Sequence, residues 1–294
     1  MNRITGLISL LRPVQWVKNL FVFLPLFFGM QLTHWQLLGP TFAAFAAFCL
    51  AASGVYCLND IIDVEADRRH PRKCRRPVAS GAVPVPLAWA AMAVCFIGAV
   101  ALLPLVKGEF GAEAAVIGVY IVINILYCYV LKRVAVLDMM VVALGFVLRL
   151  LAGSFASGVE LSHWIVMMTY LLALFLAVAK RRDDVAIFES TGKSMRRNIA
   201  GYNLAFMNIT AGMLAAMTLV CYIMYTIDPD VVARIGSRYL YLTSLWVLGG
   251  ILRYLQITLV EQRSGSPTKV MVSDGFIQTC VIGWVATFAA LLYL

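Results

Sequence analysis

A short polar run that begins at Asn59 has the residue types and the spacing to bind a metal ion together with phosphates. It reads Asn-Asp-x-x-Asp-x-x-x-Asp and ends at Asp67. At 100° per residue, Asn59, Asp60, Asp63 and Asp67 fall within about 100° of arc on one helix face. Carboxylates on one face repel each other unless a cation lies among them, and such oxygen ligands suit Mg²⁺. The alternative is a solvated acidic helix end, which is less favoured because carboxylates at membrane depth are costly and usually functional.

A basic run follows the acidic one directly. Its cationic residues are Arg68, Arg69, Arg72, Lys73, Arg75 and Arg76. Alone, such a run is typical of a cytoplasmic loop or of a contact with anionic lipid. Next to a metal-type acidic face it indicates phosphate binding, because metal ions and arginines together neutralise a departing pyrophosphate. We therefore expect Arg68, Arg75 and Arg76 to contact substrate.

Charged residues also occur in and beside later apolar segments. Lys180, Arg181 and Arg182 follow one such segment, where cations also complement the helix dipole. Asp138 and Arg149 lie on nearly the same helix face, about 16 Å apart along the axis and too far to pair directly. Arg149 is predicted near mid-bilayer and must face protein or water, either as a partner of another helix or as a substrate contact. Tyr202 either lines a cavity or packs in the core.

The elements that carry these residues are predicted to be membrane-spanning helices. The chain is 62% hydrophobic and only 13% charged, whereas soluble domains average about 25% charged. Segments of about 20 apolar residues can cross the bilayer, and they must be helical to pair their backbone groups. We expect nine spans, near residues 14–32, 38–60, 84–106, 112–131, 135–156, 162–180, 203–226, 239–259 and 273–294.

The charge distribution predicts the topology. Basic residues gather in alternate connections, at 68–76, 132–133, 180–197 and 263–269. The positive-inside rule then places the N-terminus and these loops in the cytoplasm. We expect a single all-α domain over residues 1–294, in the cell (inner) membrane among membrane lipids, with a polar cavity open to the cytoplasm. No nucleic-acid partner is expected, and a homo-oligomer is left open.

The acidic run resembles the first aspartate motif of the UbiA superfamily of intramembrane prenyltransferases. The resemblance extends over the whole chain, with nine spans and polar loops after the second, fourth, sixth and eighth. It implies that Asn59, Asp63 and Asp67 bind a diphosphate substrate through Mg²⁺, with Asp60 beside them. Typical members also carry a second aspartate-rich motif after the sixth span. This chain has the Lys180–Arg182 cations there, which suggests an anionic substrate group instead.

Three strings resemble one branch of that superfamily, the decaprenyl-phosphate phosphoribosyltransferases. They are Arg12 to Asn19, Lys180 to Arg182, and Val260 to Lys269 leading to Asp274. The branch implies transfer of a 5-phosphoribosyl group from 5-phosphoribose 1-diphosphate to a polyprenyl phosphate, with release of pyrophosphate. Its product is a cell-wall arabinan precursor.

The resemblance and the residue types together predict roles for individual residues. Asp63, Asp67 and Lys180 are the expected catalytic residues. The expected substrate-binding residues are Lys18, Asn19, Arg68, Arg75, Arg76, Asp138, Arg149, Arg181, Arg182 and Tyr202. An ionised lipid phosphate needs no general base, and direct attack at ribose C1 predicts inversion. A prenyltransferase acting on an aromatic or other small acceptor is the main alternative, and a lipid transporter is a distant third.

Overall fold

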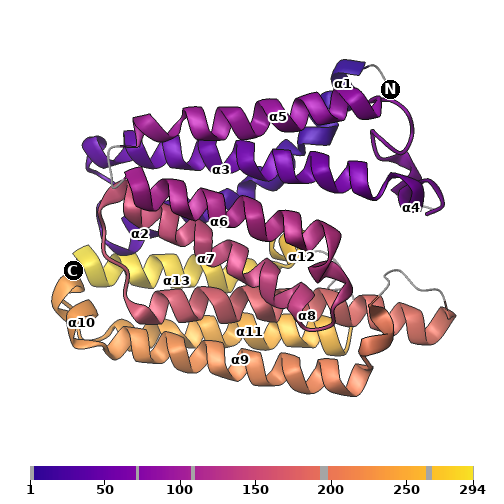
Figure 1. Ribbon diagram of the computed structural model, residues 1–294. Helices are drawn as coiled ribbons and strands as arrows, with labels where there is room; N and C mark the ends of the chain where they lie inside the picture. Colours follow the sequence, from indigo (N-terminus) through magenta and orange to yellow (C-terminus); the bar gives the residue numbers. More distant parts are fainter. Residues whose placement is uncertain (1–2, 71–72, 107–109, 193–197, 263–266, 294) are drawn as a thin grey trace. The chain divides into compact units, whose positions relative to one another are not determined.

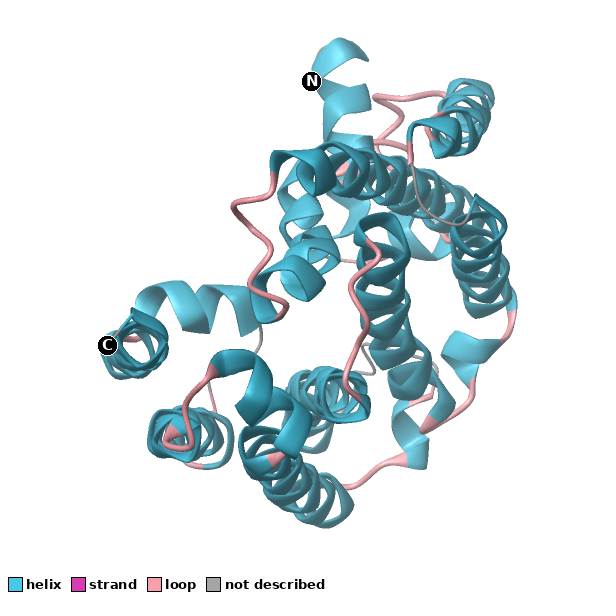
Figure 2. Ribbon diagram, turned by 90° about the vertical axis from the view of Figure 1, so that its left-hand side faces the viewer, coloured by secondary structure: helices cyan, strands magenta, loops and turns pink. Residues whose placement is uncertain are grey.

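The computed structural model describes residues 3–70, 73–106, 110–192, 198–262 and 267–293. These residues form helices joined by loops, and no strand occurs among them (Figure 2). The chain divides into two compact units. Unit 1 comprises residues 1–132 and 145–161, and unit 2 comprises residues 133–144 and 162–294. Arg72 and residues 263–266 of the C-terminal string lie outside the described residues.

Unit 1 is organised around one long buried helix, α3 (Trp35–Ile62), which packs against α1, η1, α5 and α6. Figure 1 shows α3 and α5 side by side. Small residues such as Ala44, Ala47 and Ala51 are fully buried on α3, and they let neighbouring helices approach closely. The elements of this unit are α1 (Arg3–Leu11), η1 (Pro13–Phe23), α2 (Leu24–Phe28), α3, α4 (Val64–Arg68), η2 (Lys73–Arg75), α5 (Val85–Ala101), η3 (Leu103–Leu105), α6 (Phe110–Tyr129) and residues 145–157 of α7 (Leu137–Ser157).

Unit 2 contains the first residues of α7 and the C-terminal helices. In it α9 packs against α8 and α11, and α11 packs against α13. Helix α8 begins after Ser162, whose side chain accepts a hydrogen bond from the N–H of Trp164. It ends at Thr191 and is followed by Gly192 in a left-handed conformation. The further elements are α8 (His163–Thr191), η5 (Ile199–Gly201), α9 (Leu204–Ile227), α10 (Pro229–Ile235), η6 (Leu240–Thr243), α11 (Ser244–Leu259), α12 (Pro267–Ser273) and α13 (Gly275–Tyr293), with η4 (Leu131–Arg133) at the boundary of the two units.

The prediction of an all-α polytopic membrane protein is confirmed. Among the described residues, eight helices are long and apolar enough to cross a membrane, from Arg3–Phe28 to Leu240–Leu259. A ninth apolar helix, Gly275–Leu291, is shorter. The ninth crossing and the polar cavity therefore stay predictions.

Two predicted boundaries were wrong. The first apolar segment begins at Arg3 rather than at residue 14, and the chain turns at Arg12 within it. The sixth continues to Thr191, because no glycine or proline interrupts it, so the Lys180–Arg182 cations lie inside α8 rather than after it. The second ends at Ile62, close to the predicted end, but Asp67 belongs to the separate short helix α4.

Candidate active site

The acidic cluster of unit 1 consists of Asn59, Asp60, Asp63 and Asp67. Asn59 and Asp60 lie in the last turn of α3, Asp63 follows that helix, and Asp67 lies on α4. Although the helix is interrupted, the N–H of Asp63 still donates to the Asn59 carbonyl oxygen at 3.0 Å. The N–H of Asp67 likewise donates to the Asp63 carbonyl oxygen at 2.8 Å. The hydrogen bonding of an α-helix, from each N–H to the carbonyl oxygen four residues earlier, therefore continues from Asn59 through Asp63 to Asp67.

Two arginines neutralise the buried carboxylates of this cluster. Asp60 is 1% exposed, and its Oδ1 pairs with Arg12 Nη2 at 2.6 Å and with Arg76 Nη1 at 3.3 Å. The same Arg76 nitrogen reaches Asp67 Oδ2 at 2.7 Å. Arg76 thus links two of the four predicted metal ligands, and its contact with Asp67 had no counterpart in the sequence-based prediction.

A lysine from the end of the fourth predicted span neutralises the more exposed carboxylate. Lys132 Nζ lies 2.7 Å from Asp63 Oδ1 and 3.5 Å from Asn59 Oδ1. The side chains of Lys132 and Asp63 are 19% and 28% exposed. Lys132 entered the sequence-based prediction only as a topology residue, and Arg12 only as the first residue of the string from Arg12 to Asn19.

The donor chemistry of the acidic cluster fits a hard divalent cation. It offers carboxylate and amide oxygens, and one of them, Asp60 Oδ2, is buried without a hydrogen-bond partner among the described residues. In the described parts of the chain no three His, Cys, Asp or Glu side chains converge closely enough to hold a metal. Each aspartate instead contacts a cationic side chain, so a metal ion would have to replace some of those contacts.

Arg68 and Arg75 of the basic run have more open surroundings. Arg68 contacts Glu65 at 3.3 Å, and both side chains are more than half exposed. Its Nε also donates to the Ala79 carbonyl oxygen at 3.4 Å. Arg75 is exposed on η2. Both residues are therefore accessible to a water-soluble phosphate.

The string from Arg12 to Asn19 packs along α3. Trp16 Nε1 donates to Ser53 Oγ at 3.0 Å, and Asn19 Nδ2 contacts Cys49 Sγ at 3.2 Å. Asn19 is 1% exposed, whereas Lys18 is partly exposed. Asn19 is thus part of the packing of unit 1, and of the two only Lys18 retains access to solvent or lipid.

Arg149 is the centre of a buried polar network in unit 1. Its Nε donates to Asn19 Oδ1 at 2.6 Å, Nη1 to the Gly145 carbonyl at 2.6 Å, and Nη2 to Tyr120 Oη at 3.1 Å. The guanidinium also lies over the rings of Phe48, Tyr120 and Phe146 at 5.0 to 5.7 Å. This confirms a structural partnership of Arg149 with another segment. A role in substrate binding stays a prediction.

In unit 2 the predicted residues Asp138, Arg181 and Tyr202 come together. The Asp138 carboxylate forms an ion pair with Arg181 through one oxygen and accepts a hydrogen bond from Tyr202 Oη at 2.6 Å through the other. Tyr202 Oη in turn accepts a hydrogen bond from the Val136 N–H at 2.6 Å. Asp138 is 1% exposed and Arg181 is 5% exposed. All three residues were predicted as site residues, but their mutual contacts were not predicted.

The other two cations of α8 differ in accessibility. Arg182 is 3% exposed, and it donates to Asn208 Oδ1 at 2.9 Å and to the Leu259 carbonyl at 3.4 Å. These contacts join α8 to α9 and α11. Lys180 is exposed. Of the three cations, Lys180 is therefore the one accessible to a substrate phosphate.

The position of Tyr202 affects its ionisation. Burial, reinforced by the hydrogen bond to Asp138, raises the pKa of Tyr202 to about 12. The ionised phenol would be desolvated and would lie beside a carboxylate, so the neutral form is favoured. Tyr202 is consequently a hydrogen-bond donor at physiological pH.

The described part of the C-terminal string forms a third ionic group. Arg253 on α11 contacts Asp274 Oδ2 at 2.7 Å and Glu261 Oε1 at 2.8 Å. The hydrogen bond from Arg253 lowers the pKa of Asp274. Asp274 also accepts the N–H of Ile277 at 3.0 Å and so caps α13. This group connects the end of α11 to the start of α13.

Comparisons with known sequences identify relatives over the full length. The sequence model of the UbiA prenyltransferase family matches residues 22–277. A decaprenyl-phosphate phosphoribosyltransferase of Mycolicibacterium smegmatis is 33% identical, over 99% of this chain and 94% of the relative. A protein of the same name from Corynebacterium glutamicum is 33% identical, over 100% of this chain and 88% of the relative.

Comparison with solved structures supports the same fold. A UbiA homologue from Archaeoglobus fulgidus, solved bound to GPP and Mg²⁺, superposes with a TM-score of 0.69 at 18% identity. The match covers 98% of this chain and all of that one. At this level of identity the likeness establishes the fold alone.

Proposed function

The chain belongs to the UbiA prenyltransferase family, and we propose that it transfers a 5-phosphoribosyl group from 5-phosphoribose 1-diphosphate to a decaprenyl-type polyprenyl phosphate. The observation that carries the proposal is 33% identity, over nearly the whole chain, to relatives that bear the name of this activity. The family match extends from residue 22 to residue 277, across parts of both units. This supports treating residues 1–294 as one transferase domain.

The acidic cluster is the proposed diphosphate site. Asn59, Asp63 and Asp67, with Asp60 beside them, would hold Mg²⁺, which would neutralise the charge that develops on the departing pyrophosphate. Asp60 has a second function in this proposal, because its buried carboxylate fixes the guanidinium groups of Arg12 and Arg76. Arg76 is then oriented to donate hydrogen bonds to phosphate oxygens, together with the accessible Arg68, Arg75 and Lys132.

Lys18 and Lys180 are each proposed to contact a substrate phosphate, of the ribose 5-phosphate or of the lipid. Lys180 is exposed, whereas its neighbours Arg181 and Arg182 are buried among protein acceptors. We assign the buried pair, with Asp138 and Tyr202, to holding the backbone from which Lys180 projects. In unit 1, we assign Asn19 and Arg149 to holding the string from Arg12 to Asn19 against α3.

The reaction itself needs few groups from the protein. Loss of pyrophosphate gives ribose C1 oxocarbenium character, and an oxygen of the ionised lipid phosphate attacks that carbon from the opposite side. No proton has to be removed from the attacking oxygen, so no general base is required. Inversion at C1 is the expected stereochemical result.

The membrane setting follows from the helices of the chain, which is a multi-pass membrane protein. We place it in the cell membrane with its N-terminus and basic loops on the cytoplasmic side, because 5-phosphoribose 1-diphosphate is water-soluble and the cationic loops follow the positive-inside rule. The polyprenyl tail would remain in the lipid.

A radiolabel transfer assay with the purified protein in detergent tests the proposal. It combines labelled 5-phosphoribose 1-diphosphate, Mg²⁺ and a polyprenyl phosphate, and a parallel reaction contains a prenyl diphosphate and an aromatic acid. We expect label in the lipid phase only when Mg²⁺ and polyprenyl phosphate are both present. Prenylation of the aromatic acid without phosphoribosyl transfer would instead identify the chain as a prenyltransferase for a small acceptor.

A further inference from the structure

A groove lies on unit 1 where α1 meets η1, and seven residues line it. It is an open groove with a volume of about 570 Å³, lined by Thr5, Ile8, Ser9, Arg12, Pro13, Val14 and Gln15. The bend that forms it is at Arg12, which has φ 52° and ψ 57°. A left-handed conformation is strained for a residue with a Cβ atom, and such strain is retained where the surrounding structure requires it. The α1–η1 groove therefore depends on the conformation of Arg12.

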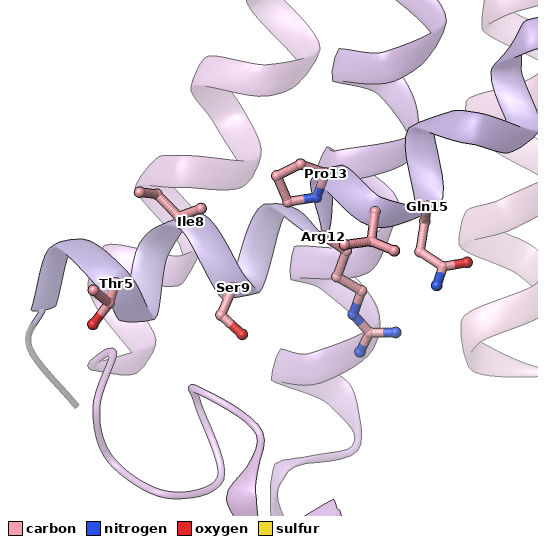
Figure 3. Close-up of a pocket in the computed structure, with 7 residues that line it drawn as sticks. Thr5, Ile8, Ser9, Arg12, Pro13 and Gln15 are labelled. Carbon is pink, nitrogen blue, oxygen red and sulfur yellow. The ribbon is translucent and has the colours of Figure 1, made fainter.

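The groove combines a cation and polar groups with apolar walls. Figure 3 shows that Thr5, Ser9 and Arg12 project to one side of the chain, whereas Ile8 and Pro13 project to the other. None of the seven lining residues is acidic. A lining that combines hydroxyl and guanidinium donors with apolar side chains suits a molecule that has an anionic head and a hydrocarbon chain.

The groove belongs to a segment that is apolar enough to enter the bilayer. Arg3–Phe28 is a candidate span, and Ile8 and Val14 on this segment are 54% and 83% exposed. Exposed apolar side chains on a membrane span face acyl chains. A lipid can therefore reach the groove from within the membrane, whereas a sugar diphosphate would approach from water.

Arg12 connects the groove to the acidic cluster. Its Nη2 atom is paired with Asp60, its guanidinium lies 4.8 Å from the centre of the Tyr56 ring, and its side chain is still 27% exposed. Because a guanidinium has five N–H donors, its pairing with one Asp60 oxygen still allows Arg12 to donate to another oxygen ligand. An anion on the accessible side of Arg12 would thus lie next to the proposed diphosphate site.

We propose that the α1–η1 groove is the docking site for the acceptor lipid, with Arg12 binding its phosphate and Ile8, Pro13 and Val14 packing on its first isoprenoid units. This assignment rests on the proposed function, because it takes a polyprenyl phosphate as the acceptor. It adds Arg12 to the residues that contact substrate, and it gives the start of the string from Arg12 to Asn19 a role in acceptor recognition.

Photolabelling of the full-length protein in detergent tests the groove directly. The probe is a polyprenyl monophosphate that carries a diazirine next to the phosphate, and the matching polyprenol is the control for the phosphate. We expect the monophosphate, but not the alcohol, to label peptides that contain residues 5–15. Labelling elsewhere, or equal labelling by the alcohol, would overturn the proposal.

Two matched substitutions sharpen the test. Ile8→Trp fills the groove and should reduce labelling about fivefold or more by steric exclusion, whereas Ile97→Trp, at a 69% exposed position on α5, should leave it unchanged. Ser9→Leu tests the same groove if Ile8→Trp gives little folded protein. Loss of label in excess phosphatidylglycerol would mean that the groove accepts any anionic lipid, which would contradict the proposal.

The outcomes for the groove and for the proposed function are separable, because labelling does not depend on turnover. Phosphate-dependent labelling of residues 5–15 without phosphoribosyl transfer would contradict the proposed function and support the groove. Transfer that is unaffected by Ile8→Trp, at subsaturating polyprenyl phosphate, would contradict the groove and support the proposed function.

Discussion

The Asp63–Lys132 pair of unit 1 and the Asp138–Arg181 pair of unit 2 are both ion pairs, but their exposure differs. The side chains of Asp63 and Lys132 are 28% and 19% exposed, whereas those of Asp138 and Arg181 are 1% and 6% exposed. A partly exposed pair can exchange its partner for a substrate or a metal ion at modest cost, since such pairs contribute little stability. A buried pair cannot, because separating it leaves an uncompensated charge in a medium of low polarity. Counter-charges and burial therefore decide which charged residues are available for chemistry.

The largest expected effect is on catalysis through the exposed pair. Asp63→Asn should lower kcat about 100- to 1,000-fold, because one group that stabilises the transition-state charge is lost, while the folded protein is retained. The transfer assay measures kcat. Glu65→Gln, an acid-to-amide change at a 74% exposed position on α4, is the matched control and should have no effect. Near-normal turnover of Asp63→Asn would contradict the metal-site assignment.

The buried pair should affect stability instead. Asp138→Ala leaves the Arg181 guanidinium without its main counter-charge and should lower the free energy of unfolding by about 3 kcal/mol. Equilibrium unfolding in mixed micelles measures this change. Asp184→Ala removes the other carboxylate near Arg181, at 3.4 Å and 19% exposed, and should be much less destabilising. Equal effects of the two substitutions would show that burial does not distinguish the two carboxylates.

Substitution of Lys180 tests whether an accessible cation of unit 2 contributes to substrate binding or catalysis. Lys180→Ala should raise KM for 5-phosphoribose 1-diphosphate, or lower kcat, by about fivefold, as expected for loss of one solvent-accessible charge contact. Steady-state kinetics separate the two parameters, and Lys180→Arg, which keeps the charge, should restore most of the activity. If neither parameter changes in Lys180→Ala, this lysine serves topology alone.

A further modest effect concerns the hydrogen bonds of Tyr202. Tyr202→Phe removes the donor to Asp138 and the acceptor for the Val136 N–H, and should lower the free energy of unfolding by about 1 to 2 kcal/mol. Burial raises the pKa of Tyr202 to about 12, above its ordinary value of 10. Folding therefore favours the protonated phenol, and this contribution is full below pH 10 and is lost as the pH rises through 12.

Unfolding measured from pH 7 to 11 checks the prediction for Tyr202. The difference in unfolding free energy between the parent chain and Tyr202→Phe should be constant up to about pH 9 and should begin to shrink above pH 10. A difference that changes between pH 7 and 8 would indicate that another group titrates in this network.

The sequence predicted the fold well because hydrophobicity is a local property of each segment. The positions of most apolar helices followed from runs of about 20 apolar residues, and they end within a few residues of the observed helices. The prediction failed where helix ends depend on tertiary contacts or on charged residues that can continue a helix. The extension of α8 to Thr191 and the turn at Arg12 are the clear examples.

For the candidate site, the sequence by itself determined the residue types and their order along the chain, including the acidic run from Asn59 to Asp67. It could not determine which cation meets which carboxylate, because the partners are far apart in the chain. Arg12 meets Asp60 across 48 residues, Lys132 meets Asp63 across 69, and Arg181 meets Asp138 across 43. Only the tertiary structure decided these pairings and how far each is removed from solvent. Arg181 and Arg182 are buried, which is the physical reason why we assign them a structural role. Lys180 is exposed, which is why we propose it as a substrate contact.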